Sequence, residues 1–583
     1  MERRVFLAIL LSFVVLYGYQ ALFVPATPSK TPQGSSTSNA PGAPTPTVPT
    51  DTRAAVTEAA VPAPATDEPP ALTTEPSERE IVVETTTVQV TFSNRGGRVL
   101  RWRLKAYRDK DGNPVDLVPT EMPADQPRPF SLATEDQSVA RRLNRALYRV
   151  NGDTDGRAMA ILKPATVTFE FQDANGLHAR KEFTFEPTGY VVSFASTVTA
   201  GTQVLSTRIA WGPGLGDAGA TAGGGSFLTG NYVQRPEAIF HREGDVTRVP
   251  ATELEEQPVQ VGTFRFAGVD DHYFIAAAVD LGQARLEFRP VTVAGPNNTQ
   301  RQMVSHTIEL MNPAQPVRFF VGPKQFDVLR SVDQELVRAI NFGMFGFLSV
   351  PLLNGLKWVH GYVGNWGWSI VVLTILINLA IAPLRHKSVV SMRKMQALQP
   401  QLKAIQDHYA GLKVTDPARQ KMNTEIMSLY REKGVNPASG CVPMLLTMPI
   451  LFAFYSLLSQ AIELRGAEFG LWIKDLSEHD PFYVTPVLMA ATMFWQQRIS
   501  PSTADPTQQK IMMMMPFMFG VMFLWVPSGL VIYWFVGNLW AIGQQYFTNW
   551  LIGPPVTASV RPAAERRMKN AGAGRTPAAE RKN

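Results

Sequence analysis

Six long apolar runs divide this chain. The first extends from Val5 to Val24, and the others lie near the C-terminal end, at Asn365–Leu384, Cys441–Gln460, Phe482–Gln497, Ile511–Val526 and Leu530–Trp550. About 20 apolar residues, rising about 1.5 Å each in a helix, cover the hydrocarbon core of a bilayer. The pattern therefore predicts an α-helical membrane protein with six transmembrane helices. Pro527-Ser528-Gly529 is expected to break the helix between the last two.

Between the first and second runs, apolar residues recur at every second position. These alternating segments lie at 88–92, 167–171, 183–185, 190–194, 285–288 and 317–321. Turns rich in Gly and Asn, such as 94–97 and 173–176, separate several of them. Short strands joined by such turns, without helical periodicity between them, are typical of an antiparallel sandwich. We expect an all-β sandwich domain over residues 80–325.

The N-terminal run is longer than the apolar part of a cleaved signal peptide, and Pro25–Pro28 is a poor cleavage site. We expect residues 1–24 to be an uncleaved transmembrane anchor, with cleavage as the alternative. Residues 25–79 are rich in Pro, Ala, Thr and Ser. Such a segment buries too little apolar surface to offset its ordering entropy, so we predict a disordered linker.

Two further segments have helical patterns. In residues 326–364, polar positions such as Asn341, Asn354 and Lys357 interrupt apolar ones, which predicts an amphipathic helix on the outer membrane face; a plain hydrophobic linker is the alternative. Residues 386–433 predict a cytoplasmic helical hairpin within a membrane core of residues 365–552. Its apolar seams contain Met395, Leu398, Leu402, Ile405 and Tyr409 in the first helix and Ile426 and Tyr430 in the second.

Charge indicates the orientation. The segment Arg385–Lys433 holds ten Lys and Arg residues, whereas Glu463–Asp480 holds five acidic residues against two basic ones. The tail, residues 553–583, is again basic. By the positive-inside rule, both termini and the hairpin lie in the cytoplasm and the β domain lies outside it. Topology thus accounts for the net charge of +6, which would indicate nucleic-acid binding only if the cations shared one surface.

The sequence offers little for covalent chemistry. It has no GxxxxGK[ST] phosphate-binding loop, and His241, His272 and His306 are scattered without metal-ligand spacing. Its single cysteine, Cys441, excludes an intramolecular disulfide. We expect no catalytic residue, no metal and no cofactor.

Polar side chains nevertheless recur inside the predicted spans. They are Thr374, Asn378 and Arg385 on one face of the second span, Thr447 on the third, and Tyr533, Trp534 and Asn538 on the last. Polar groups that face lipid are costly, so these should face other helices or a wet cavity. Hydrogen bonds between helices would by themselves also explain the Thr and Asn residues.

Methionine is abundant in the same spans. We regard as candidate substrate contacts Met444, Met448, Pro449, Met512 and Met515. Flexible, polarizable methionines suit a surface that accepts many different apolar helices. Contact with lipid or simple core filling is the alternative for each methionine.

Several motifs resemble the YidC/Oxa family of membrane protein insertases. They are NWGWSI from Asn365, the Pro-Leu pair before a basic turn at 383–384, LYREKGVNPASGCVP from Leu429 and PSGLVIYWFVGN from Pro527. The order and spacing match from about 341 to 550, which makes the resemblance specific. In the β region, SNRGGRVLRWRL, DDHYFIAA and VGPK resemble the periplasmic domain of Gram-negative members.

The resemblance implies a five-helix insertase core, and a periplasmic β-supersandwich similar to sugar-mutarotase folds. It also implies a hydrophilic groove among the helices, open to the cytoplasm and lipid. The family's groove usually carries an arginine at the position of Asn378, and this chain departs from that pattern. Arg385 lies two turns closer to the cytoplasm and can reach the groove mouth with its long side chain.

We therefore predict an inner-membrane insertase and chaperone without enzymatic activity, with its large domain in the periplasm. The partners implied by the resemblance are nascent membrane proteins, the Sec translocon, and the ribosome or signal recognition particle pathway through hairpin and tail. Contact of the basic tail with membrane lipids is the alternative that charge alone supports. Two other functions stay open: a membrane channel or transporter, and a membrane-anchored periplasmic carbohydrate-active protein.

Overall fold

A computed structural model describes most of the chain beyond residue 70. The described residues are 71–109, 111–119, 122, 126–152, 158–215, 235–256, 258–294, 300–311, 315–409, 418–435, 442–500 and 506–553. They all belong to one compact unit, Glu68–Asn583. The predicted anchor, residues 25–70 of the predicted linker and the tail from residue 554 lie outside the described residues.

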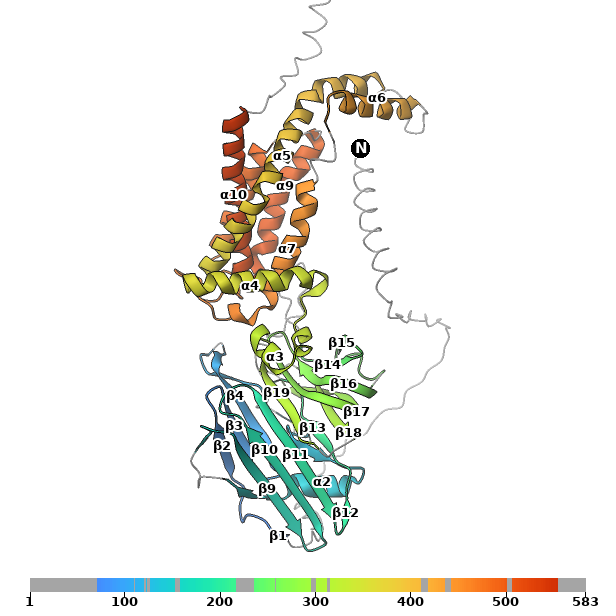
Figure 1. Ribbon diagram of the computed structural model, residues 1–583, viewed down its shortest axis with the longest axis vertical. Helices are drawn as coiled ribbons and strands as arrows, with labels where there is room; N and C mark the ends of the chain where they lie inside the picture. Colours follow the sequence, from blue (N-terminus) through green and yellow to red (C-terminus); the bar gives the residue numbers. More distant parts are fainter. Residues whose placement is uncertain are drawn as a thin grey trace, which may run out of the picture. The chain divides into compact units, whose positions relative to one another are not determined.

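The β region contains a larger and a smaller sheet (Figure 1). The larger sheet has the order β1 (Ala71–Thr73), β9 (Ala165–Asp173), β10 (Leu177–Phe185), β11 (Val191–Ala200), β19 (Val317–Pro323), β17 (Phe274–Ala294), β16 (Val259–Asp270), β14 (Glu237–Arg242) and β15 (Asp245–Val249). Attached to it are β12 (Gln203–Val204), β13 (Arg208–Trp211), β18 (Gln300–Leu310), β6 (Ser131–Ala133) and β7 (Arg149–Asn151). The smaller sheet has the order β5 (Pro114–Asp116), β4 (Arg98–Arg108), β3 (Val88–Ser93), β2 (Glu80–Glu84) and β8 (Met159–Ala160). One short helix, α2 (Gln137–Arg145), follows β6.

Inward-facing aromatic residues join the two sheets. Phe92 of β3 contacts Phe169 of β9 and Phe183 of β10, with ring centroids 5.5 and 4.7 Å apart. Trp102 of β4 donates its indole N–H to Val321 O of β19 at 3.1 Å. The strands predicted from alternation at 88–92 and 167–171 are confirmed, and all of their alternating apolar residues are buried.

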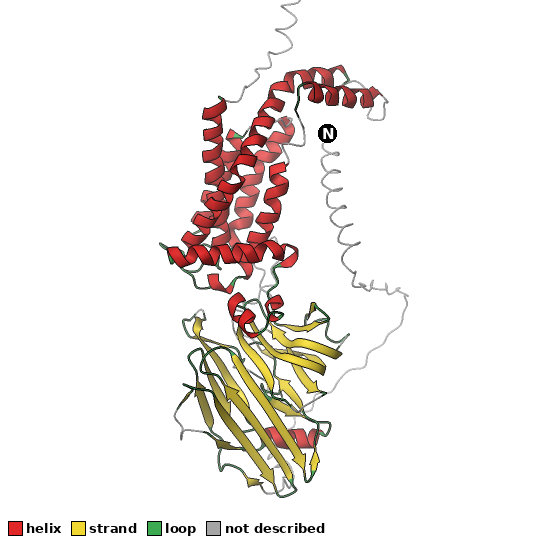
Figure 2. Ribbon diagram, in the orientation of Figure 1, coloured by secondary structure: helices red, strands yellow, loops and turns green. Residues whose placement is uncertain are grey.

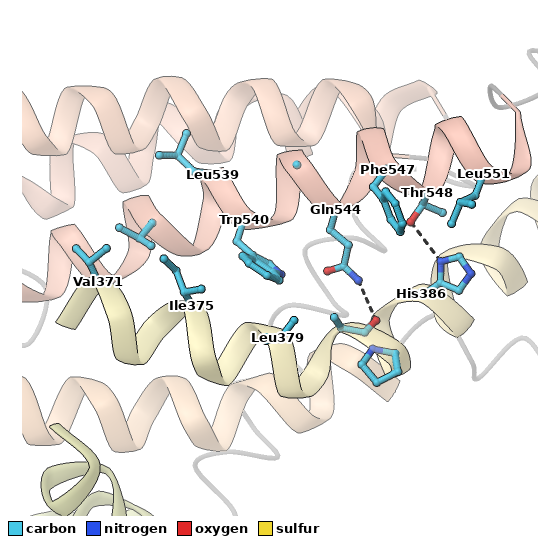
Figure 3. A pocket seen from close by; sticks show the side chains of 14 residues that line it. Val371, Ile375, Leu379, His386, Leu539, Trp540, Gln544, Phe547, Thr548 and Leu551 are labelled. Atoms are coloured by element: carbon cyan, nitrogen blue, oxygen red, sulfur yellow. Dashed lines mark hydrogen bonds between the residues drawn. The ribbon is translucent and has the colours of Figure 1, made fainter. Parts of the chain in front are cut away.

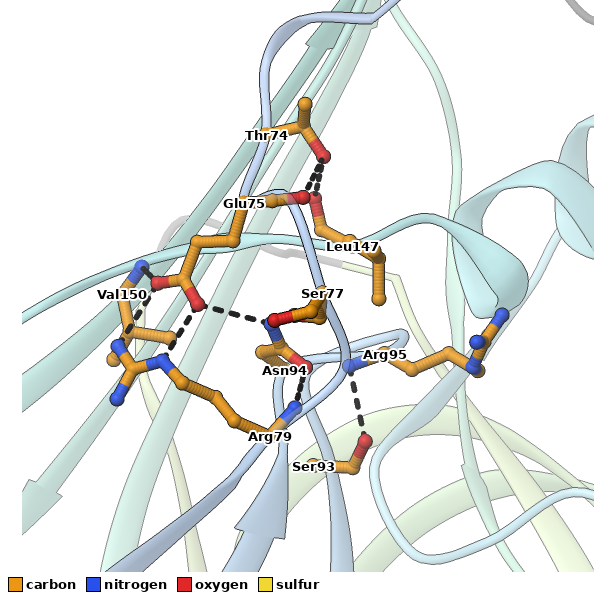
Figure 4. Close-up of polar contacts among 9 residues, drawn as sticks. All are labelled: Thr74, Glu75, Ser77, Arg79, Ser93, Asn94, Arg95, Leu147 and Val150. Atoms are coloured by element: carbon orange, nitrogen blue, oxygen red, sulfur yellow. Dashed lines mark hydrogen bonds and ion pairs between the residues drawn. The ribbon is translucent and has the colours of Figure 1, made fainter. Parts of the chain in front are cut away.

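The predicted disordered linker is wrong for residues 71–79. Strand β1 pairs with β9, and the carboxylate of Glu75 accepts hydrogen bonds from Arg79 Nε at 2.6 Å, Asn94 Nδ2 at 3.0 Å and Val150 N at 3.0 Å (Figure 4). Polar contacts with distant strands order this segment, and its composition does not reveal them.

The rest of the described chain is helical (Figure 2). Its elements are α3 (Phe326–Val332), η3 (Leu336–Ala339), η4 (Gly343–Phe345), α4 (Gly346–Val363), α5 (Trp366–His408), α6 (Ala418–Glu432), α7 (Val442–Gln460), η6 (Ile462–Leu464), α8 (Val484–Ile499), α9 (Pro506–Met522), η7 (Phe523–Trp525) and α10 (Ser528–Ile552). Each of the five predicted runs of the core overlaps one helix, in the order α5, α7, α8, α9 and α10, and the predicted break at Pro527 separates η7 from α10.

The structure does not establish the number of spans. By length and mean hydropathy, α5 is the one helix in the described part of the chain that is long and apolar enough to cross a membrane. A shorter apolar helix covers Lys510–Trp525. The six-span count stays a prediction.

A single amphipathic helix over 326–364 is also wrong. Phe326, Leu329 and Leu336 are buried in the hydrophobic core that the β region shares, so α3 and η3 form separate short elements. The one long helix of this segment is α4. Its buried positions include Leu353 and Leu356.

The predicted end of the second apolar run at Leu384 is not a helix end. Helix α5 continues through Pro383 and Pro400 to His408, so the first helix of the predicted hairpin is the C-terminal part of α5. A proline removes one i→i−4 hydrogen bond from a helix. The helix can continue through it when the turns on both sides keep their own hydrogen bonds. The start of α5 is set by Asn365, whose side-chain oxygen accepts a hydrogen bond from Trp368 N at 3.0 Å.

Candidate functional site

The polar residues predicted on α5 point into the helical bundle. Thr374 is fully buried and Asn378 is nearly so. The Thr374 hydroxyl donates to Ile370 O at 2.6 Å, and Asn378 Nδ2 donates to Thr374 O at 2.8 Å. Both groups therefore use a backbone carbonyl one turn earlier on their own helix, which lowers the cost of burying them.

The buried residues Thr374 and Asn378 of α5, with Asn538 of α10, are called the polar stripe below. Polar residues of α10 also contact two other helices, α8 and α7. Asn538 is buried, and its Nδ2 lies 3.4 Å from Met489 O and 3.4 Å from Thr492 Oγ1, both on α8. Tyr533 is also buried and stacks on Phe454 of α7, with ring centroids 4.4 Å apart. Asn538 and Tyr533 thus lie inside the bundle rather than on its outer surface.

Trp534 has a different environment from the other predicted groove residues. Its ring contacts Phe519 of α9 at 5.9 Å and Phe523 of η7 at 5.0 Å between centroids. The contacts of Trp534 are thus aromatic ones, which hold α10 against α9 and η7.

Arg385 lies two turns beyond Asn378 on α5, about 10 Å along the helix axis. Its side chain is partly buried. Thr447 of α7 is partly buried.

The candidate substrate contacts differ in exposure. Met448, Met512 and Met515 are exposed, and Pro449 is partly buried within α7. Met444 belongs to α7, but its side chain lies outside the described residues.

In the hairpin, Leu398 is buried and the other predicted seam residues of α5 and α6 are partly buried. The two helices are joined by a hydrogen bond from the Tyr409 hydroxyl to Glu425 Oε1 at 2.9 Å.

Buried polar residues at the C-terminal half of α10 were not predicted. Gln545 and Thr548 are buried, and Thr548 Oγ1 lies 3.4 Å from His386 Nδ1 of α5. Gln545 lies seven residues after Asn538, on the same helix face. That spacing is the signal that could have identified Gln545.

Nothing in the described residues suggests a metal centre: they contain no group of three or more His, Cys, Asp or Glu side chains placed to hold an ion. The polar groups above can hydrate a space or bind a polar peptide segment, and they lack the paired acid and base of a hydrolytic site.

Comparisons with known proteins cover nearly the whole chain. The family described as "60Kd inner membrane protein" matches residues 358–553, and "YidC periplasmic domain" matches residues 80–354. A membrane protein insertase YidC from Geobacter metallireducens is 35% identical over 573 residues, covering 94% of this chain and 98% of the relative. The protein of the same name from Oleidesulfovibrio alaskensis is 34% identical over 566 residues, covering 94% and 99%.

Solved structures show weaker similarity. A crystal structure of an active YidC insertase with its first transmembrane domain resolved matches at 18% identity and a TM-score of 0.33, covering 82% of this chain and 95% of the other. A galactose mutarotase-like protein from Lactobacillus casei matches at 13% identity and a TM-score of 0.24, covering 42% of this chain and all of the other.

Proposed function

The chain belongs to the YidC family of membrane protein insertases, and from this premise we propose that it inserts membrane proteins through a polar groove formed by α5, α7 and α10. It is an inner-membrane protein with a periplasmic domain. The groove is lined by Thr374, Asn378, Arg385, Thr447, Tyr533 and Asn538.

The burial of the polar stripe carries this proposal. Thr374 and Asn378 are buried in the apolar stretch 370–384 of α5, and Asn538 is buried in the apolar stretch 530–543 of α10. A helix bundle that needed only to be stable would place apolar side chains there, because polar groups in the hydrocarbon region gain little from burial. Buried polar side chains on both α5 and α10 support a polar interior, which the proposal takes to be hydrated.

The groove acts without a covalent step. The polar flank of an incoming segment enters the hydrated space, which shortens the apolar distance that it must still cross. The apolar part of the segment then leaves sideways into lipid. Burial of apolar surface, about 25 cal/mol per Å², drives that exit.

Arg385 supplies positive charge at the groove mouth, whereas the position of Asn378 is uncharged. Attraction by a cation at the Asn378 level is thus dispensable, and hydration of the stripe is the essential property. The exposed Met448, Met512 and Met515 provide an adaptable apolar surface next to the groove.

The same proposal includes the topology. Six spans place both termini and the α5–α6 hairpin in the cytoplasm, and the two β-sheets form a sandwich in the periplasm. The hairpin and the basic tail then face the ribosome or signal recognition particle pathway, the Sec translocon is a lateral partner, and nascent membrane proteins are the clients.

The test is reconstitution of the full chain into liposomes, followed by insertion of a short single-span protein. Replacing Asn378 and Thr447 together by leucine should lower insertion by roughly tenfold or more, since it removes polar groups from two walls of the groove. The matched control replaces Leu376 and Phe452 by alanine, because these residues are exposed on the same two helices. Unchanged insertion by the Asn378/Thr447 variant would remove the groove from the mechanism.

A further inference from the structure

A second feature of the bundle is an apolar cleft between α5 and α10 (Figure 3). Its volume is about 820 Å³. Its walls include Val371, Ile375 and Leu379 on α5 and Leu539 on α10. The cleft is distinct from the polar stripe, since none of the groove residues lines it.

One end of the cleft is polar. His386 of α5 and Thr548 of α10 lie there with Nδ1 and Oγ1 3.4 Å apart. Gln544 of α10 also lines this end and donates its Nε2 hydrogen to Ala382 O at 2.9 Å. The cleft therefore has an apolar part and a polar end, like a lipid molecule.

The apolar part has the length of one leaflet. From Val371 to Pro383 the helix rises about 18 Å, and half of the hydrocarbon core of a bilayer measures about 15 Å. A single acyl chain can therefore lie along the cleft from its polar end toward the bilayer centre.

Several cations follow His386 along α5. Lys387 and Lys394 are exposed on α5 near His386, and Arg393 donates hydrogen bonds to Asn549 Oδ1 and Gly553 O of the α10 end. The sequence contains no Asp or Glu between residues 385 and 406 or within α10. The charged side chains of these two stretches are therefore all basic and complementary to an anionic headgroup.

We propose that the α5–α10 cleft binds one acyl chain of an anionic phospholipid, with the phosphate beside His386, Thr548 and Lys387. The inference rests on the same membrane placement as the proposed function, but it does not require insertion activity. The chain's own N-terminal apolar run is a poorer occupant, because Arg3 and Arg4 at its predicted cytoplasmic end would meet the same cations.

The first test is lipid retention measured by native mass spectrometry on the full chain in detergent. Phosphatidylglycerol and phosphatidylcholine with identical acyl chains are the probes. We expect one phosphatidylglycerol to be retained about tenfold more tightly than phosphatidylcholine, because the cations favour the anionic headgroup. Equal retention of the two lipids would overturn the proposal.

Two glycines of α10 provide a matched pair of variants. Gly543 lines the cleft and Gly537 does not, and a Cβ added at either would meet open space. Gly543→Leu should lower phosphatidylglycerol retention about tenfold by filling the cleft, whereas Gly537→Leu should leave it unchanged. Leucine also favours a helix over glycine, so both variants should fold. Unchanged retention by Gly543→Leu would contradict the assignment.

A headgroup variant and a crosslinking experiment complete the design. Lys387→Gln with Lys394→Gln should reduce the preference for phosphatidylglycerol without changing phosphatidylcholine retention, and Lys421→Gln on α6 should change neither.

In a Cys441→Ser background, a disulfide between Gly543→Cys and Leu11→Cys would show that the N-terminal run occupies the cleft. A disulfide between two copies of Gly543→Cys would show a second copy there. Either disulfide would overturn the proposal, whereas insertion measured on the same preparations tests the proposed function separately.

Discussion

At the scale of single residues, the β region holds a buried lysine in its aromatic core. Lys181 of β10 is fully buried, and its Nζ donates to Gly96 O at 2.6 Å, Phe130 O at 2.7 Å and Gly97 O at 3.3 Å. Gly96 and Gly97 have positive φ angles of 73° and 52°, a conformation that glycine adopts most readily. The two carbonyls of the glycine turn thus accept hydrogen bonds from Lys181 Nζ. A third carbonyl, Phe130 O, belongs to another segment and accepts from the same nitrogen.

Lys181→Met should destabilise the protein by about 2–4 kcal/mol, because three buried carbonyls lose their hydrogen-bond donor. Thermal unfolding of the full chain in detergent measures the loss. Lys163→Met, at an exposed position, is the control and should change the stability by less than about 0.5 kcal/mol. A Lys181→Met protein as stable as the wild type would show that the hydrogen bonds only offset the cost of burying the lysine.

The stability of the protein should also depend on pH through Lys181. Burial, with a smaller contribution from the charge of Arg98, lowers the pKa of Lys181 from 10.5 to about 7. Between these values the unfolded chain binds more protons than the folded one, so the contribution of Lys181 to stability rises with pH. The stability difference between wild type and Lys181→Met should therefore widen from pH 7 to pH 10. A difference that narrows over this range would contradict the pKa shift.

At the scale of elements, the sequence predicts those strands and helices whose inward positions are apolar. Strand β17 shows where alternation fails. Only residues 285–288 were predicted, but the strand runs from Phe274 to Ala294, with positive φ at Asp280 and Gly282 and a register shift against β16. Such irregularities interrupt the alternation of apolar and polar residues along the strand. The strand nevertheless continues, because its backbone stays hydrogen-bonded to the neighbouring strands.

In the candidate site, too, spacing within one helix predicts some features, whereas contacts between helices determine others. Helical spacing predicts that Thr374 and Asn378 share one face, and both are buried. The packing of Trp534 among aromatic rings and the approach of Asn538 to α8 depend on which helices pack together. No pattern within one helix contains that information.

Near the start of α5, Gly367 lies directly against the ring of Phe469, and this contact can be tested by substitution. A Cβ at Gly367 would lie 2.1 Å from Phe469 Cδ2 and 2.8 Å from Phe469 Cβ, so Gly367→Ala must displace the loop before α8. We expect a loss of about 1–3 kcal/mol in thermal unfolding followed by tryptophan fluorescence. In α4, Gly361→Ala meets open space and should be neutral or stabilising by up to about 1 kcal/mol. Equal effects of the two variants would contradict the contact at Gly367.

At the scale of the whole molecule, two motifs that carry the family resemblance meet where the β region contacts the helical region. Lys324 of VGPK donates its backbone N–H to Tyr273 O at 2.7 Å, and its Nζ pairs with Asp270 of DDHYFIAA at 3.1 Å. From the same turn, His272 Nε2 lies 2.7 Å from Ser459 O at the end of α7. Arg465 lies over the ring of Tyr273, 5.4 Å from its centroid. The motifs thus build the connection between the two regions.

An ion-pair network lies beside this turn. Lys357 of α4 pairs with Asp327 of α3 at 2.8 Å and with Glu463 of η6 at 2.9 Å. Helix α4 is therefore bound both to the segment that follows the β region and to the segment that follows α7. Its orientation is set by both.

His272 makes the junction sensitive to pH. A carbonyl only accepts, so Nε2 donates to Ser459 O, and Nδ1 is buried without a partner among the described residues. Burial first, and then the charges of Lys324 and Arg465, lower the pKa of His272 from 6.5 to about 4, although the hydrogen bond to Ser459 opposes the shift. Between pH 4 and pH 6.5 the unfolded chain binds more protons, so the contribution of His272 to stability rises with pH over this window.

The matched variant is His272→Gln, which removes the titrating group and keeps a hydrogen-bond donor. The stability difference between wild type and variant should increase by up to about 3 kcal/mol from pH 4 to pH 6.5 and stay constant above pH 7. Asp271 is present in both proteins; burial raises its pKa to about 6, which gives the opposite dependence, so only the difference isolates the histidine. Thermal unfolding of both proteins in detergent across this range gives the measurement. A constant difference would mean that His272 stabilises the junction through its hydrogen bond alone, and that acid does not loosen the contact between the turn and α7.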